Sequence, residues 1–141
     1  MFTRVASHLR NRADWLMSGQ FDRVTAGYRY PFPVWLGAGP VIVRTPAEAE
    51  SMLVLQRALY LKRGVFALVP RIAALELPRG RGIRVWVDWE ERAQSPEESR
   101  CASTIYYLTA ESAGLMIEMV QNLTLTMPEF RPHFASLALS A

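Results

Sequence analysis

The chain has 141 residues, 50% of them hydrophobic, and a formal net charge of +3. This length and hydrophobic content predict one folded domain over 1–141 with its own core, and they exclude an intrinsically disordered chain. Because Cys101 is the single cysteine, an internal disulfide is excluded and a reducing, cytoplasmic setting is expected.

The N-terminal segment 1–12 contains Arg4, Arg10 and Arg12 without a long apolar run behind them. No apolar stretch in the sequence approaches the ~20 residues that a membrane-spanning helix needs. We therefore expect neither a signal peptide nor a membrane anchor, and no membrane partner.

The basic residues are nearly all arginines scattered along the chain, since Lys62 is the single lysine. Their densest group is Arg79, Arg81 and Arg84, around one predicted hairpin turn, where a solvated loop and a phosphate-binding patch are the two interpretations. No zinc knuckle or RNA-binding strand motif supports the patch. We therefore expect no nucleic-acid partner.

Two helices are predicted at the start of the chain. Apolar residues at spacings of three and four indicate the first helix: Phe2, Val5, Leu9, Ala13 and Leu16. We expect this helix to end at Gly19, because glycine adopts the left-handed conformation of a helix end without steric cost. Phe21, Val24 and Tyr28 indicate a second, shorter helix, which must end before Pro31.

Short strands are predicted next, at 33–36 and 41–43, around the turn 37–40. The strongest local signal in the chain follows them. Thr45 as N-cap, Pro46 at the first helical position and Glu48 form a capping box. The third helix then runs to Arg63, and Gly64 closes it.

The region 65–127 is predicted as antiparallel strands, separated by turn signals at 78–82, 94–99 and 110–114. In 83–91, alternation assigns Ile83, Val85, Val87 and Trp89 to the core. In 115–125 the same rule places Gln121, a polar residue, on the apolar face. The inward face of 102–108 is left open, and the tail 128–141 is expected to form one short helix from Pro132.

This order of elements resembles the nuclear transport factor 2-like superfamily, in particular its SnoaL-like (polyketide-cyclase-like) bacterial members. The residues that carry the likeness are Gly19-Gln20-Phe21-Asp22 with the helix up to Tyr28, the strand at 33–36, the capped third helix and the closing strands. The resemblance implies an α+β fold. Its cone-shaped barrel is a strongly bent antiparallel sheet wrapped around three N-terminal helices, which close a pocket. It also implies a dimer in many members, but no particular activity.

Several residues are candidates for contact with a small, mainly apolar molecule in that pocket. Gln121 is one, because a buried amide needs partners, although a protein neighbour would satisfy it as well as a ligand. The others are aromatic, so a plain core role stays open for each of them. They are Trp15, Tyr28, Tyr30, Trp35, Trp89 and Tyr106.

Three outward-facing residues, Trp86, Asp88 and Glu118, are expected at a homodimer interface. Asp88 is also a candidate for a catalytic base, with Tyr106 as donor to an oxyanion, as the isomerase-like relatives imply. Alternation points Asp88 away from the core, which favours the structural interpretation.

Neither His8 nor His133 has other potential metal ligands at the sequence spacings typical of metal sites, so no metal site is expected. His8 is expected to be exposed near the start of its helix. No phosphate loop or dinucleotide motif is present, and no cofactor is expected. Three functions stay open: a small-molecule-binding domain, a lyase or isomerase, and a structural or partner-binding module without catalysis.

Overall fold

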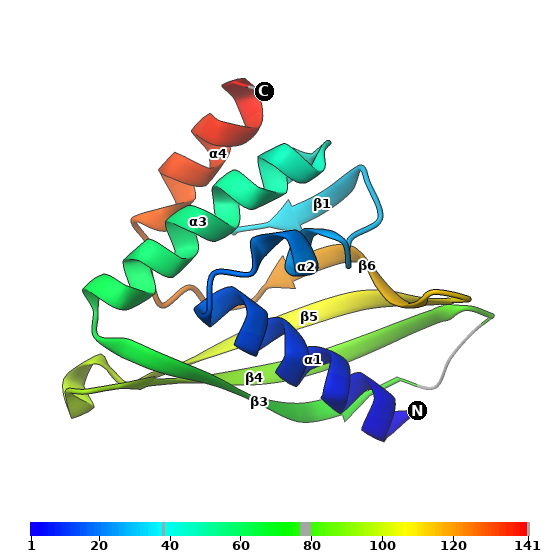
Figure 1. Cartoon of the computed structure of the whole chain (residues 1–141), viewed down its shortest axis with the longest axis horizontal. Helices are drawn as coiled ribbons and strands as arrows, with labels where there is room; N and C mark the ends of the chain where they lie inside the picture. Colours follow the sequence, from blue (N-terminus) through cyan, green and yellow to red (C-terminus); the bar gives the residue numbers. More distant parts are fainter. Residues whose placement is uncertain (38, 77–79, 141) are drawn as a thin grey trace.

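The computed structural model describes residues 1–37, 39–76 and 80–140. Its helices lie over one face of a curled sheet, and the two chain ends lie far apart (Figure 1). The elements are α1 (Phe2–Met17), α2 (Phe21–Thr25), β1 (Phe32–Trp35), β2 (Pro40–Val43), α3 (Pro46–Lys62), β3 (Val65–Leu75), β4 (Gly82–Ala93), the short 3-10 helix η1 (Pro96–Glu98), β5 (Arg100–Glu111), β6 (Gly114–Asn122) and α4 (Phe130–Ser140).

The third helix begins with the predicted cap. The hydroxyl of Thr45 accepts a hydrogen bond from the backbone N–H of Glu48 at 3.2 Å, and Pro46 occupies the first turn. The Glu48 carboxylate accepts from the backbone N–H of Arg44 at 3.4 Å, one residue earlier than in a standard capping box. Gly64 follows the helix with a φ of +74°, a conformation that glycine adopts without steric cost.

The six strands form one sheet in the order β2-β1-β6-β5-β4-β3, which curls around the helices without closing. Neighbouring strands pair antiparallel, with one exception: β1 runs parallel to β6, where Val34 lies opposite Val120 and Trp35 opposite Gln121. The expected α+β architecture is therefore confirmed, but the sheet is open and mixed rather than a closed antiparallel barrel.

A bulge in β6 changes which residues face the helices. Tyr107 pairs with Met119 and Leu108 pairs with Ile117, so Glu118 has no partner across the ladder. The alternation therefore shifts by one residue after Ile117. Val120 and Asn122 face inward instead of Gln121, and the prediction that Gln121 lies on the apolar face is wrong.

The C-terminal segment packs on the domain. Helix α4 begins at Phe130, two positions before the expected Pro132, and lies beside α3 (Figure 1). The rings of Phe130 and Phe134 stack with centroids 5.4 Å apart, and Phe134 is fully buried. The tail thus contributes to the hydrophobic core.

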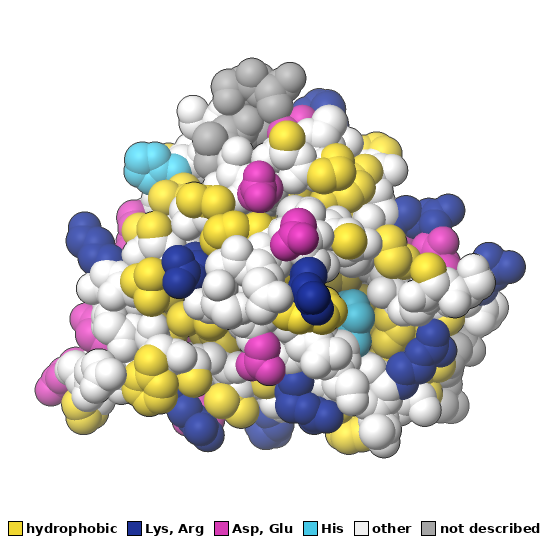
Figure 2. Space-filling model, in the orientation of Figure 1, with side chains coloured by type: hydrophobic (Ala, Val, Ile, Leu, Met, Phe, Trp, Pro, Cys, Tyr) yellow, Lys and Arg dark blue, Asp and Glu magenta, His cyan; other side chains and the backbone are white. Residues whose placement is uncertain are grey.

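Charged side chains are dispersed over the face seen in Figure 2, where basic groups are interspersed with acidic and uncharged ones. Of the predicted arginine group, Arg79 lies outside the described residues, whereas Arg84 forms an ion pair with Glu76 at 2.7 Å and lies over the Trp86 ring. Among the described residues, no helix is long and apolar enough to cross a membrane.

Candidate functional site

A cavity of about 100 Å³ lies between the inner face of the sheet and helices α1, α3 and α4. The larger part of its wall is apolar, and the rest is formed by polar side chains. The apolar residues of the wall are Ala13, Leu16, Val34, Leu36, Met52, Leu53, Leu68, Trp89, Ala102, Val120, Leu125, Met127, Phe130 and Phe134. The polar residues are Arg12, Tyr28, Gln56, Tyr60, Glu91, Thr104, Tyr106, Asn122, Thr124 and Thr126. Such a wall is typical of small-molecule sites.

One polar group is centred on Arg12, which α1 directs into the cavity. Its guanidinium carbon lies 5.1 Å from the ring centroid of Tyr28 and 5.8 Å from that of Tyr106, within the range of cation–π contacts. The Tyr106 hydroxyl accepts a hydrogen bond from Trp89 Nε1 at 2.9 Å. Two tyrosines, from the α2–β1 connection and from β5, thus contact one cation, and Trp89 of β4 contacts one of them, Tyr106.

Burial acts on the ionisation of this cluster. Burial alone would lower the pKa of Arg12, but the phenol oxygens of Tyr28 and Tyr106 offset it, so the pKa of Arg12 is raised. Burial also raises the pKa of Tyr28, against the opposing effect of Arg12. At neutral pH the cluster therefore combines a charged guanidinium with a neutral Tyr28 phenol.

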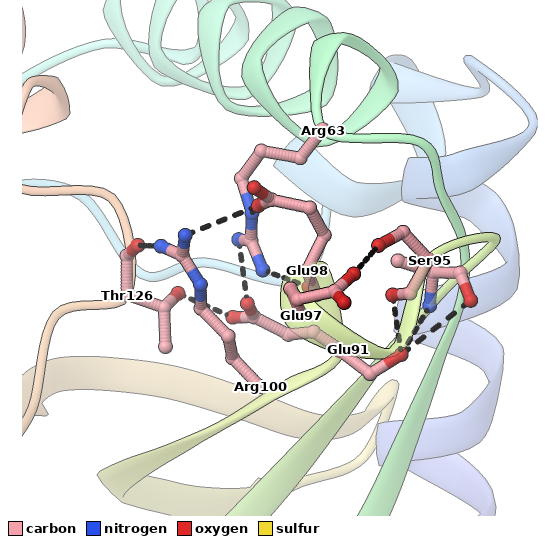
Figure 3. A network of polar contacts seen from close by, with 9 residues as sticks. Arg63, Glu91, Ser95, Glu97, Glu98, Arg100 and Thr126 are labelled. Atoms are coloured by element: carbon pink, nitrogen blue, oxygen red, sulfur yellow. Dashed lines mark hydrogen bonds and ion pairs between the residues drawn. The ribbon is translucent and has the colours of Figure 1, made fainter.

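A second polar group surrounds Glu91, whose side chain is 1% exposed (Figure 3). Its Oε1 accepts from Arg63 Nη1 at 2.7 Å, and its Oε2 accepts from the Thr126 hydroxyl at 2.6 Å. Arg63 also donates to the side chain and the backbone carbonyl of Glu98, at 3.2 Å and 2.6 Å. Both oxygens of the Glu91 carboxylate are therefore engaged by protein groups.

Tyr60 on α3 adds a neutral hydroxyl to the cavity wall. It accepts a hydrogen bond from Gln56 Nε2 at 3.3 Å. Burial, followed by the nearby negative charge of Glu91, raises the pKa of Tyr60. Its phenol therefore stays protonated at neutral pH and can donate a hydrogen bond.

His8 lies one helical turn before Arg12 and is partly buried, so the expectation that it is exposed is wrong. Its Nδ1 is buried and is the one side-chain polar atom, among the described residues, that is buried without a hydrogen-bond partner. Burial, reinforced by the charge of Arg12, lowers the pKa of His8 to about 4. The ring is neutral at physiological pH.

The structure brings three of the predicted ligand-contacting residues to the cavity wall: Tyr28, Trp89 and Tyr106. Inward-facing Ala102, Thr104 and Tyr106 also resolve the open question of which side of β5 faces the helices.

The other four candidates lie away from the wall formed by the described residues. Trp15 lies beside Arg23, and the Tyr30 hydroxyl donates to the Thr25 carbonyl at 2.8 Å. Trp35 is 37% exposed. Gln121 accepts a hydrogen bond from the Tyr107 hydroxyl at 3.2 Å on the outer face.

Asp88 is also outside the cavity. It forms an ion pair with Arg71 and accepts a hydrogen bond from the Ser103 hydroxyl at 3.0 Å, both on the outer face of the sheet. The suggestion that Asp88 serves as a base in the pocket is therefore wrong. Among the described residues, the carboxylate that lines the cavity is that of Glu91. Trp86 shares the outer face with Asp88, and Glu118 is exposed at the bulge.

Sequence reasoning missed Arg12, Glu91 and Asn122. Alternation could have found Glu91. Every second residue of β4 faces inward, and Glu91 is the next such position after Val85, Val87 and Trp89. Arg12 lies next to Ala13 on the apolar side of α1, but one arginine on a helix carries no signal of its own. Among the described residues, no group of three His, Cys, Asp or Glu side chains could hold a metal ion.

No protein-family model matches the sequence, and no curated protein matches it. Solved structures do resemble it. A domain of unknown function with a cystatin-like fold from Nostoc punctiforme superposes with a TM-score of 0.65, at 17% identity, over 95% of this chain and 85% of its own. An NTF2-like protein of unknown function from Shewanella oneidensis gives 0.64, at 12% identity, over 86% and 97%. A protein from Catenulispora acidiphila, in complex with S-DNPA, gives 0.59, at 13% identity, over 86% and 92%.

Proposed function

We propose that this chain, which has the nuclear transport factor 2-like fold, binds a small, mainly apolar molecule in the cavity between its helices and the sheet. The observation that carries the proposal is the cavity of about 100 Å³, whose wall combines aliphatic and aromatic side chains with convergent polar ones. A larger cavity of ~150 Å³, lined by apolar side chains, holds a benzene molecule, which sets the scale of ligand to be expected here. The similar fold from Catenulispora acidiphila holds S-DNPA, which supports small-molecule binding by this architecture.

Two observations favour binding over the alternatives. A general base needs a carboxylate free to accept a proton, whereas Arg63 and Thr126 occupy both oxygens of Glu91. A purely structural module is expected to fill its interior with side chains, whereas this interior is open. Ligand binding without proton abstraction is therefore the function that we favour.

We also propose that the chain forms a homodimer through the outer face of the sheet, at Trp86, Asp88 and Glu118. Trp86 is partly exposed beside Tyr107, and Arg84 lies over both rings, at 5.0 Å and 5.8 Å. Aromatic and arginine side chains of this kind are enriched in interfaces. The single cysteine, Cys101, is free and exposed, which fits the cytoplasmic setting that we propose.

Native mass spectrometry of the freshly purified protein tests the ligand proposal, with the denatured mass as reference. We expect extra mass that dissociates on denaturation. In Val120→Phe the larger ring would fill part of the cavity, and we expect the extra mass to be lost. Val54→Phe, at a position on α3 that is 47% exposed, is the matched control and should keep it. Two negative results together would contradict the proposal. The purified protein would carry no extra mass, and neither indole nor benzyl alcohol would raise its thermal stability.

A further inference from the structure

Arg12 differs from the arginines that form ion pairs in this chain. The ion pairs of the described residues use Arg29, Arg63, Arg71, Arg84, Arg92 and Arg100, each with a Glu or an Asp. No ion pair of Arg12 is found among the described residues, although Arg12 is the arginine that lines the cavity. The contacts of its guanidinium are with Tyr28 and Tyr106.

These contacts leave binding capacity unused. A guanidinium presents five N–H donors in one plane, whereas aromatic rings offer it only their faces and one hydroxyl each. Arg12 is half-buried, and withdrawing a cation from water without an anion is unfavourable unless another group compensates the charge. The neutral Tyr28 phenol does not supply that charge.

The cavity's own carboxylate is also unable to do so. Glu91 is engaged by Arg63 at 2.7 Å and by Thr126 at 2.6 Å, so its negative charge is already balanced within the wall. The cavity therefore has an excess of positive charge at Arg12. An anion that entered would meet a guanidinium held between two aromatic rings.

We propose that Arg12 binds a carboxylate of the molecule that occupies the cavity, which makes the ligand class small apolar carboxylic acids. This inference rests on the proposed function. A carboxylate matches the planar fork of a guanidinium, and the charge-assisted hydrogen bonds between them are among the strong ones in proteins. The Tyr106 hydroxyl, which accepts from Trp89, can donate its own proton to the same anion. The apolar part of the acid would lie against Leu16, Val34 and Leu53.

The test compares benzoate with benzamide, which have the same size but differ in charge, by calorimetric titration of the intact protein at pH 7. We expect benzoate to bind at least about tenfold more tightly. This comparison needs no variant, so it does not depend on how well a mutant folds. Equal affinities would overturn the carboxylate proposal while the cavity-binding proposal stands. Binding of neither compound would contradict both.

Variants then locate the effect. Arg12→Met keeps the aliphatic stem, and we expect it to lose the preference for benzoate over benzamide. Arg12→Lys keeps the charge but not the planar fork, and an intermediate preference is expected. Arg10→Met removes the same charge from an exposed position of the same helix and is the matched control. If Arg10→Met lowers the preference as much as Arg12→Met, the attraction is a general effect of charge, and the assignment to Arg12 is wrong.

Discussion

Arg63 and Glu91 form a buried ion pair that joins the end of α3 to the inner face of β4. Their side chains are 9% and 1% exposed, and Nη1 lies 2.7 Å from Oε1. Thr126, beyond the end of β6, donates to the other oxygen of Glu91 at 2.6 Å. Three segments distant in the sequence are thereby held together at one side of the cavity (Figure 3).

Replacing one member of this pair should be strongly destabilising. In Arg63→Met the Glu91 carboxylate would stay buried without its counter-ion, and we expect the free energy of unfolding to fall by about 3 kcal/mol. Arg71→Met is the control, because Arg71 pairs with Asp88 from a side chain that is 73% exposed, and its loss should cost less than about 1 kcal/mol. Urea unfolding measures both values.

The same pair offers an internal check. If the cost in Arg63→Met comes from an unpaired charge, replacing Glu91 by Leu in the same protein should restore part of the lost stability. A double variant that is less stable than Arg63→Met would show that lost packing, rather than the unpaired carboxylate, causes the effect.

Tyr106 and Tyr107 allow a comparison of the two faces of the sheet. Tyr106→Phe removes the acceptor of the buried Trp89 indole N–H, so we expect a loss of about 1–3 kcal/mol in the free energy of unfolding. Tyr107→Phe removes a partly buried hydrogen bond of 3.2 Å to Gln121, whose amide can turn to water. Its cost should be below about 1 kcal/mol. Urea unfolding measures the free energy of unfolding of both variants. Equal losses would contradict the view that water can replace the Tyr107–Gln121 hydrogen bond but not the Trp89–Tyr106 hydrogen bond.

The order of elements and the alternation of β4 were enough to predict the α+β fold, because both depend on local patterns. Thr45, Pro46 and Glu48 marked the start of α3 correctly for the same reason. Similar solved structures confirm the nuclear transport factor 2-like fold. The parallel pairing of β1 with β6 has no local signal, since it joins residues 86 positions apart, Val34 and Val120.

The cavity was harder to predict than the fold. One unpaired residue, Glu118, shifts the phase of β6, and this moved Gln121 to the outside and Asn122 to the inside. A bulge of this kind depends on how β5 and β6 pair, which alternation within one strand does not reveal. Arg12 likewise acquires its role only when Tyr28 and Tyr106 approach it from other elements.

The proposed dimer predicts a specific response to charge on the outer face. Trp86→Arg should weaken a dimer formed through this face, because a second cation would lie beside Arg84. Phe66→Arg is the control, since Phe66 is 57% exposed on β3 and lines a second pocket between β3 and α1. Light scattering across a concentration series measures the mass. A wild-type monomer, or a dimer lost in Phe66→Arg but not in Trp86→Arg, would contradict the assigned interface.

His8 should make stability depend on mildly acidic pH. Its folded-state pKa is lowered from 6.5 to about 4, first by burial and second by the charge of Arg12. A proton therefore binds the unfolded chain before it binds the folded one as the pH falls below 6.5. The stability contribution is complete above pH 6.5 and decreases toward pH 4, with a loss of about 2 kcal/mol between pH 7.5 and 5.

Urea unfolding of His8→Gln at pH 7.5, 6.5, 5.5 and 5.0 isolates this contribution. Because glutamine does not titrate, we expect the loss over this range to be smaller in His8→Gln than in the wild type by about 2 kcal/mol, whatever the absolute stability of the variant. His133→Gln is the matched control, since His133 is exposed on α4, and it should follow the wild-type curve. If His8→Gln and the wild type lose the same stability between pH 7.5 and 5.0, His8 takes up its proton equally well in both states, and its buried Nδ1 does not oppose protonation.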